Sequence, residues 1–197
     1  VQLQIGFTTA VDGRMTEIMA NLPVVRPTFM AGPPRIFEKV YARVIQTAQG
    51  EGAVKARLFN WAFGVGQQVA RARHDGRRPN PAVLAQYVVA DLLVLSQIRA
   101  RLGGRIRFLV SGGAALSPDI AAWFDATGLP LLEGYGLTET GGGTSIGSLD
   151  HPTPGAVGPP LVGAEVKLAD DGEVLVRGPM VMRGYHNLPQ ATADVLG

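Results

Sequence analysis

The 197-residue chain contains no cysteine. This absence excludes disulfide bonds, thiolate catalysis and metal sites built on cysteine, and it is compatible with a cytoplasmic location. Charge is also scarce, since charged residues make up 17% of the sequence and the formal net charge is +2. So small a charge gives no reason to expect a nucleic-acid partner. His74, His151 and His186 are far apart and show no metal-ligand spacing, so we expect each at the surface.

Long hydrophobic runs are missing as well. The most apolar stretch, residues 83–98, is interrupted by three polar side chains, Gln86, Asp91 and Gln97. This makes the stretch too short and too polar to span a membrane. No signal peptide is visible near the N-terminus. We therefore expect a cytoplasmic protein with no transmembrane segment, for which peripheral contact with a membrane remains open.

Hydrophobic residues make up 46% of the chain, which is enough to bury a sizeable core. Their helical spacing predicts helices, which we place at residues 16–22, 34–49 and 54–74, and from residue 83 to a glycine C-terminus at Gly103-Gly104. Short apolar runs predict strands, which we place at residues 1–7, 27–31, 106–110 and 129–133. The expected fold class is α/β, with a partial parallel sheet flanked by helices and followed by a small antiparallel β-rich portion.

The antiparallel portion follows a connector with four prolines at residues 151–160. Residues 164–168 and 173–177 alternate around Asp170-Asp171-Gly172, which favours a hairpin. We therefore divide the chain into an α/β part, residues 1–158, and a β-rich part, residues 159–197. The chain starts inside a strand-like run and stops just after a helix start. We therefore expect both parts to be incomplete pieces of a larger protein.

One strand–helix–strand unit is expected to bring two glycine loops together. Its helix has Ser117 at the N-cap and Pro118 in the first turn, and it lies between the strands at 106–110 and 129–133. Such a unit is parallel and right-handed, so the loops after both strands reach the same edge of the sheet. Ligands of open α/β sheets bind at that edge.

The two loops offer different chemistry. Ser111-Gly112-Gly113-Ala114 presents backbone with small side chains, and Tyr135 offers a flat ring, so a planar ligand could lie between them. Two unrelated glycine turns would show the same pattern, and the spacing leaves that alternative open. Thr138 can donate to a phosphate oxygen, and Glu139 is an oxygen ligand suited to Mg²⁺.

Four stretches in order resemble the adenylate-forming enzymes, which include acyl-CoA synthetases, luciferases and nonribosomal-peptide adenylation domains. Their core signature is similar to Tyr135-Gly136-Leu137-Thr138-Glu139-Thr140. Residues 107–117 resemble the adenine-side loop of the family, and residues 172–185 resemble a later hairpin motif. Residues 34–41 and the long helical insertion after them resemble bacterial long-chain fatty acyl-CoA synthetases, specifically part of their large N-terminal domain.

The resemblance implies a reaction in two steps, with ATP, a fatty acid and CoA as substrates. A fatty acid carboxylate attacks the α-phosphate of ATP to give acyl-AMP and pyrophosphate, and the thiol of CoA then displaces AMP. The implied nucleotide-binding residues are Ser111, Gly112, Gly113, Ala114, Gly134, Tyr135, Gly136, Leu137 and Thr138.

The roles that the resemblance implies differ along this set. Tyr135 stacks on adenine, and the carbonyl of Gly134 accepts from the adenine amino group. Gly136 and Leu137 lie against the acyl carboxylate. Thr138 bonds the attacked phosphate and Glu139 holds Mg²⁺, so the catalytic residues are Thr138 and Glu139.

Simpler explanations stay open for several side chains. Leu137 could be buried, and Thr140 could only cap a turn. Glu133 could orient a neighbour or be a charge at the end of a strand. Arg177 and Arg183 are better explained as surface charges of a hairpin than as nucleotide ligands.

Three parts that the family uses are not found in the sequence. These are the triphosphate loop that ends in lysine, the aspartate that binds the ribose, and the C-terminal domain with its catalytic lysine. We therefore expect the isolated chain to be inactive. We also expect uncovered sheet edges and apolar faces to leave it either self-associated, as a homo-oligomer, or only marginally stable. The alternatives are adenylation of another acid, transfer to a carrier protein, or a non-catalytic nucleotide-binding module.

Overall fold

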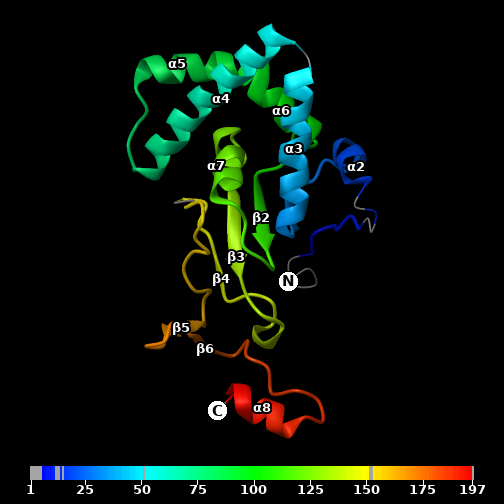
Figure 1. Cartoon of the computed structure of the whole chain (residues 1–197), viewed down its shortest axis with the longest axis vertical. Coiled ribbons are helices and arrows are strands. Elements are labelled where there is room, and N and C mark those ends of the chain that lie inside the picture. Colours follow the sequence, from blue (N-terminus) through cyan, green and yellow to red (C-terminus); the bar gives the residue numbers. More distant parts are fainter. Residues whose placement is uncertain (1–5, 12–13, 15, 51, 151–152, 197) are drawn as a thin grey trace.

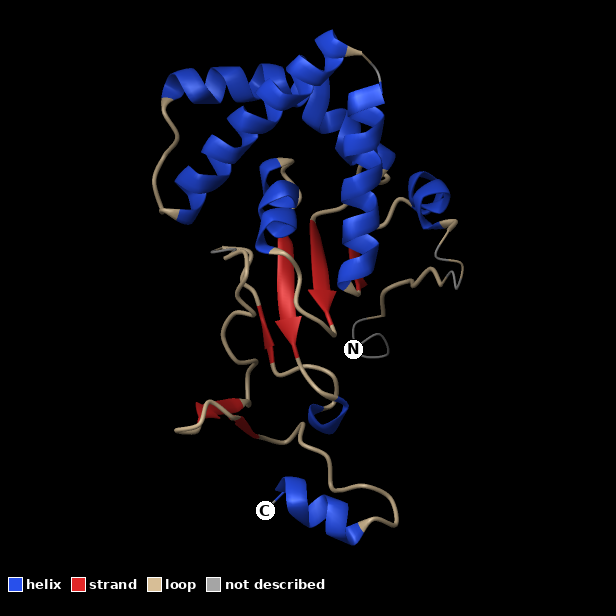
Figure 2. Ribbon diagram, in the orientation of Figure 1, coloured by secondary structure: helices blue, strands red, loops and turns tan. Residues whose placement is uncertain are grey.

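The computed structural model describes residues 6–11, 14, 16–50, 52–150 and 153–196. Within these residues a four-stranded sheet has the order β1-β2-β3-β4, and a separate two-stranded sheet pairs β5 with β6. The bounds of the larger sheet's strands are β1 Phe29–Gly32, β2 Phe108–Gly112, β3 Leu131–Tyr135 and β4 Ser145–Ile146. Figures 1 and 2 show helices above and beside this sheet. The predicted α/β class is confirmed.

The described helices occupy most of the chain before β2. Their bounds are α2 Ile18–Val25, α3 Pro34–Gly50, α4 Ala53–His74, α5 Pro81–Ala90, the π-helical segment η1 Asp91–Leu95, and α6 Ser96–Arg101, followed after β2 by α7 Pro118–Ala126. Segments α5, η1 and α6 follow one another without a break and form one helix from Pro81 to Arg101.

The parallel strand–helix–strand unit is present as predicted. Strand β2 pairs in parallel with both β1 and β3, and β4 runs antiparallel to β3. Helix α7 connects β2 to β3, although the predicted side-chain cap is wrong because Ser117 makes no capping hydrogen bond. Strands β2 and β3 each begin and end two residues later than predicted, since Gly112 and Gly134 pair within the sheet.

Two predictions near the N-terminus need correction. Residues 1–5 of the first predicted strand lie outside the described residues, and Gly6 and Phe7 are not in a strand. Helix α2 continues through Pro23 and ends at Val25, where the left-handed backbone of Arg26 (φ 50°) caps it. Pro23 is tolerated because it lies in the second turn of a short helix, where few backbone bonds are lost.

The core lies where α3 and α7 pack against the sheet and α4 packs on α7. Phe37 and Phe124 are fully buried, and their rings meet edge to face at a centroid distance of 5.9 Å. Asp125 is also buried and pairs with Arg73 at 3.2 Å and with Nε2 of His74 at 2.9 Å. The expectation that His74 is a simple surface residue is therefore wrong, because its ring is half-buried against the carboxylate of Asp125.

The predicted hairpin is confirmed. Strands β5 (Glu165–Leu168) and β6 (Val174–Arg177) pair antiparallel, and helix α8 follows at Pro189–Leu196. Figure 1 shows this part at the lower end of the molecule, beyond the ends of β2 and β3. The division of the chain at residues 158 and 159 stays a prediction.

Candidate functional site

Two glycine loops meet at the lower edge of the sheet, where β2 and β3 end (Figure 2). The parallel register places Ser111 beside Glu133 and Gly112 beside Gly134. The loops after these two strands therefore leave the sheet side by side. This confirms the prediction that the strand–helix–strand unit delivers both loops to one edge.

The first loop is small and close to its neighbour. A Cβ atom on Gly112 would lie 3.4 Å from the carbonyl oxygen of Gly134. Gly113 has a φ of +83°, which favours glycine, and both Gly113 and Ala114 are exposed. Ser111 is buried, and its hydroxyl has no hydrogen-bond partner within the described part of the chain. A bound polar ligand could satisfy this group.

The second loop is held in shape by its own hydroxyl groups. Segment η2 (Thr138–Thr140) forms a single tight turn. The buried hydroxyl of Thr140 accepts from the backbone N–H of Leu137 at 2.9 Å and from the hydroxyl of Thr144 at 2.9 Å. Thr140 therefore shapes the loop and does not face a ligand. This agrees with the alternative, left open by the sequence, that Thr140 only caps a turn.

The residues between Tyr135 and Thr140 face different environments. Tyr135 is half-buried, and its carbonyl accepts from the N–H of Thr144 at 2.8 Å. Leu137 is 45% exposed, which rules out the alternative that it is a core residue. Thr138 is also exposed. Gly136 is required by close packing, since a Cβ there would lie 2.5 Å from the carbonyl oxygen of Gly142.

Glu139 is fixed by the segment that follows β6. The hydroxyl of Tyr185 donates to Oε1 of Glu139 at 2.6 Å, and the N–H of Met182 donates to its carbonyl oxygen at 2.7 Å. The tyrosine hydrogen bond, helped by a backbone N–H, lowers the pKa of Glu139, and the same bond raises the pKa of Tyr185. The carboxylate is thus kept ionised. Sequence reasoning missed this partner, which lies 46 positions away.

Glu133 holds the loop on the other side of the site. Its Oε1 accepts from the N–H of Gly155 at 2.7 Å, and its carbonyl accepts from the N–H of Gly147 at 2.9 Å. Glu133 was expected either to orient a neighbour or to be a charge at the end of a strand, and these two hydrogen bonds favour the orienting role. Arg177 pairs with Glu165 across the exposed hairpin, so it is a surface charge, as expected.

A metal ion would find one carboxylate at this edge. In the described ranges no group of three or more His, Asp or Glu residues is arranged to hold a metal. Glu139 has an ionised carboxylate with a second oxygen beside the one that Tyr185 bonds, and Mg²⁺ is often held by one or two carboxylates together with substrate phosphates. The residues therefore fit Mg²⁺ bound jointly with a nucleotide, and do not fit a site made of protein ligands alone.

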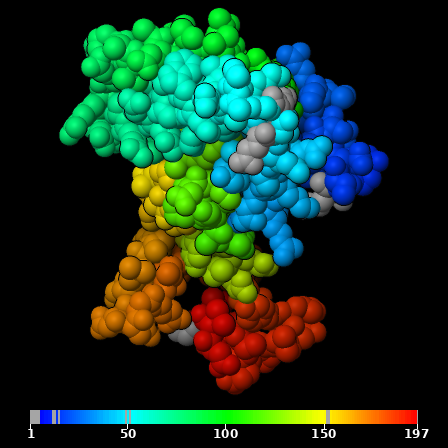
Figure 3. Space-filling model, turned by 45° about the horizontal axis from the view of Figure 1, so that its top comes forward, coloured from blue at the N-terminus to red at the C-terminus, as the bar shows by residue number. Residues whose placement is uncertain are grey.

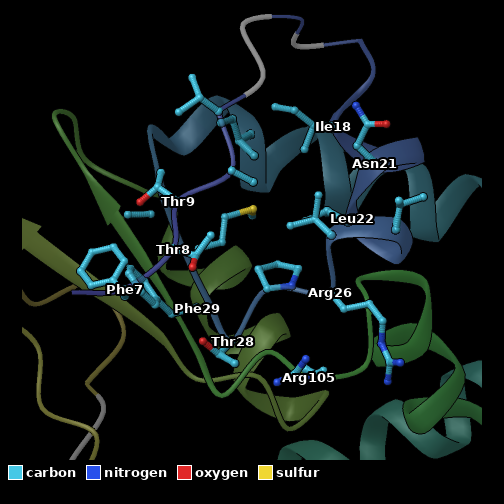
Figure 4. Close-up of a pocket in the computed structure, with 18 of the residues that line it drawn as sticks. Phe7, Thr8, Thr9, Ile18, Asn21, Leu22, Arg26, Thr28, Phe29 and Arg105 are labelled. Carbon is cyan, nitrogen blue, oxygen red and sulfur yellow. The ribbon is translucent and has the colours of Figure 1, made fainter. Parts of the chain in front are cut away.

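A large hollow lies elsewhere (Figure 4). It has a volume of about 1350 Å³ and is lined by β1, α2 and the N-terminal segment, including Phe7, Leu22 and Phe29. Its walls are mainly apolar, and none of the predicted site residues lines it. The chemistry-bearing side chains therefore gather at the loops and not in this hollow.

Comparison with known proteins gives a consistent picture. Residues 3–186 match the family of AMP-binding enzymes. The long-chain-fatty-acid–CoA ligase FadD15 of Mycobacterium bovis is 38% identical over 193 residues, which cover 98% of this chain and 31% of that protein. Fatty acyl-CoA synthetase A of Dictyostelium discoideum is 34% identical over 208 residues, which cover 98% and 29%. The chain thus spans about a third of the length of these relatives.

Solved structures share the fold. ATP-bound MatB from Rhodopseudomonas palustris superposes with a TM-score of 0.52 at 24% identity, covering 95% of this chain and 29% of that one. The anthranilate CoA ligase AuaEII in complex with anthranoyl-AMP gives a TM-score of 0.52 at 17% identity, covering 91% and 27%. At these identities the likeness concerns the fold alone.

Proposed function

Since the chain belongs to the family of AMP-binding enzymes, we propose that the protein that carries it activates a fatty acid as acyl-AMP and transfers the acyl group to CoA. The observation that carries this proposal is the register that sets Gly112 beside Gly134, so that the Ser111–Ala114 loop and the Tyr135–Thr140 loop share one edge. An adenine ring would lie between the backbone of Gly113 and the ring of Tyr135.

The nucleotide-binding roles follow from the environment of each residue. The unpartnered hydroxyl of buried Ser111 and the carbonyl of Gly134 supply polar contacts beside the slot. Exposed Thr138 donates to a phosphate oxygen, and Glu139 holds Mg²⁺, which neutralises phosphate charge when it is bound. Gly136 and Leu137 border the site of the acyl carboxylate.

The reaction has two displacements. A carboxylate oxygen of the acid forms a bond to the α-phosphorus of ATP while the bond to pyrophosphate breaks. The sulfur of CoA, having lost its proton, then forms a bond to the acyl carbon while the bond to AMP breaks. The described residues contribute by positioning the reactants and by stabilising the charge on the phosphate.

The proposed acid is a long-chain fatty acid. Support comes from the relatives named above and from the helical insertion of α3 to α6 between β1 and β2. We also propose that the 197 residues alone do not turn over, because they span about a third of those relatives.

The test is acid-dependent exchange of pyrophosphate into ATP, measured on the natural protein that carries this sequence. The acids are a series of saturated fatty acids, an aryl acid and malonate. The proposal expects exchange that is greatest with long chains, and thioester formation on addition of CoA. Exchange only with the aryl acid or malonate would overturn the choice of acid, and no exchange with any acid would overturn the adenylation itself.

A further inference from the structure

The helix from Pro81 to Arg101 carries an apolar surface that the fold does not cover. Exposed apolar side chains follow one another at helical spacing along α5 and η1, namely Leu84, Val88, Val89, Leu92 and Leu93. Val88 and Leu92, four positions apart, are 67% and 73% exposed. Contiguous exposed apolar surface of this kind marks an interaction site rather than a scatter of single residues.

This helix also differs from the prediction made from its sequence. It begins two residues before Val83, because the side chain of Asn80 accepts from the N–H of Ala82 and caps the helix. Its end at Arg101, just before Gly103-Gly104, is as predicted. By length and composition alone, its 21 residues are long and apolar enough to cross a membrane, and 17% of the most apolar window is buried. The expectation that this stretch is too short to span was therefore wrong.

The opposite side of the helix is tied into the fold, which argues against a spanning role. Ala90 and Leu95 are fully buried in the core. Arg99 pairs with Asp91 at 2.7 Å and donates to the carbonyl of Thr127, just after α7, at 2.9 Å. A helix with one side packed and an ion pair beside it lies on a surface rather than within a bilayer.

The segment of the chain that carries the apolar stripe has an excess of positive charge. Residues 53–101 contain eight lysine and arginine residues and two aspartates, a net charge of +6, whereas the whole chain has +2. Arg77 and Arg78 are exposed just before the helix begins. Beside Leu93, a hollow of about 350 Å³ between α3, α4 and the helix has Lys55 and Arg101 among its lining residues. Arg73 and Arg99 are paired with Asp125 and Asp91, and Arg77 lies 3.9 Å from Asp75. Exposed Arg57, Arg71 and Arg78 are the cations of this segment that the proposal below relies on.

This apolar surface lies at the opposite end of the molecule from the two glycine loops, so a partner bound to it would not cover them. Figure 1 shows α4 and α5 at the upper end of the molecule and the glycine loops at the lower end of the sheet. Figure 3, with the top turned forward, shows the same helices forming a broad face. We propose that this face docks on an anionic phospholipid surface, with the apolar stripe of α5 and η1 in the interface and the flanking cations on lipid phosphates. This inference does not depend on the proposed reaction.

The test is binding of the natural protein to vesicles of phosphatidylcholine alone and of phosphatidylcholine mixed in equal parts with phosphatidylglycerol. The proposal expects clear binding to the anionic vesicles, weak binding to the neutral ones, and release as the salt concentration rises. Double substitution Val88→Asp and Leu92→Asp should lower the partition coefficient about tenfold or more. Double substitution Arg77→Gln and Arg78→Gln should lower it about tenfold on anionic vesicles.

Matched controls separate this surface from general effects. Val162 and Leu168 are 105% and 66% exposed on the β-rich part, so Val162→Asp with Leu168→Asp should leave binding unchanged. Lys39→Gln with Lys167→Gln removes the same charge outside the helical face. Circular dichroism melting checks that each variant folds. Equal loss of binding in the controls, or no vesicle binding by the folded wild type, would overturn the proposal. So would a dimer in sedimentation experiments that the Val88 and Leu92 substitutions dissociate in the absence of lipid.

Discussion

The hydroxyl of Tyr185 lies 2.6 Å from Oε1 of Glu139 and donates to it. This bond joins the signature loop after β3 to the segment after β6, and these two strands belong to different sheets. A second bond, from the N–H of Met182 to the carbonyl of Glu139, acts in parallel. The carboxylate proposed to hold Mg²⁺ is therefore positioned by the β-rich part of the chain.

Tyr185→Phe should raise the pKa of Glu139 toward its ordinary value of 4.5, because the tyrosine bond is the largest cause of its lowering. At a pH above the ordinary pKa of 4.5, the lowered pKa of Glu139 stabilises the folded state. This stabilisation is lost as the pH falls through the lowered pKa. The measurement is carboxyl titration by NMR, with unfolding followed over the same acidic range. Tyr41→Phe is the control, since Tyr41 packs on Trp123 far from the site. An unchanged Glu139 titration in Tyr185→Phe would show that the bond is not made in solution.

Thr140→Val should destabilise the protein by about 1–3 kcal/mol, because the buried hydroxyl of Thr144 and the N–H of Leu137 lose their shared partner. Thr140→Ser keeps the hydroxyl and should cost much less. Urea denaturation of both variants measures the difference. Equal stability of the two variants would contradict the role assigned to this hydroxyl.

Gly136→Ala should destabilise by about 1–3 kcal/mol, since the added methyl meets the backbone of Gly142 at 2.5 Å and the loop must move. Gly64→Ala, in helix α4, meets nothing within 4 Å and should stabilise by roughly 0.5–1 kcal/mol. Thermal unfolding distinguishes the two. A neutral Gly136→Ala would mean that the loop is looser than described.

Asp125→Ala should destabilise by about 2–3 kcal/mol, because Arg73 and His74 lose a buried charged partner. The figure is modest because the Arg73 side chain is 38% exposed and partly screened by water. Asp75→Ala, at the exposed residue that directly follows His74 and ends α4, should change stability by less than about 0.5 kcal/mol. If Asp125→Ala lost as little stability as Asp75→Ala, the ion pair of Asp125 would not contribute to the stability of the fold.

The sequence was sufficient where local patterns decide the structure. Apolar spacing predicted α3 and α4 within a residue or two, and turn residues predicted the β5–β6 hairpin. The strand–helix–strand unit also followed from local signals, and with it the meeting of the two glycine loops.

Contacts between distant residues could not be predicted. The hydrogen bonds of Tyr185 to Glu139 and of Arg73 to Asp125 depend on how separate elements pack, and nothing in the local sequence encodes them. The exposure of Val88 and Leu92 was missed for the same reason. Apolar residues lie on both sides of that helix, so their spacing alone cannot show which side is buried. The packing of α4 against the helix decides it.

The central claim is that the Ser111–Ala114 loop and the Tyr135–Thr140 loop form one nucleotide slot. It is tested most directly by photolabelling the natural protein with 8-azido-ATP and identifying the labelled peptides by mass spectrometry. The account predicts label in both loops and its loss when unmodified ATP competes. Label confined to residues around Phe7, Leu22 and Phe29, which line the large apolar hollow, would contradict the account.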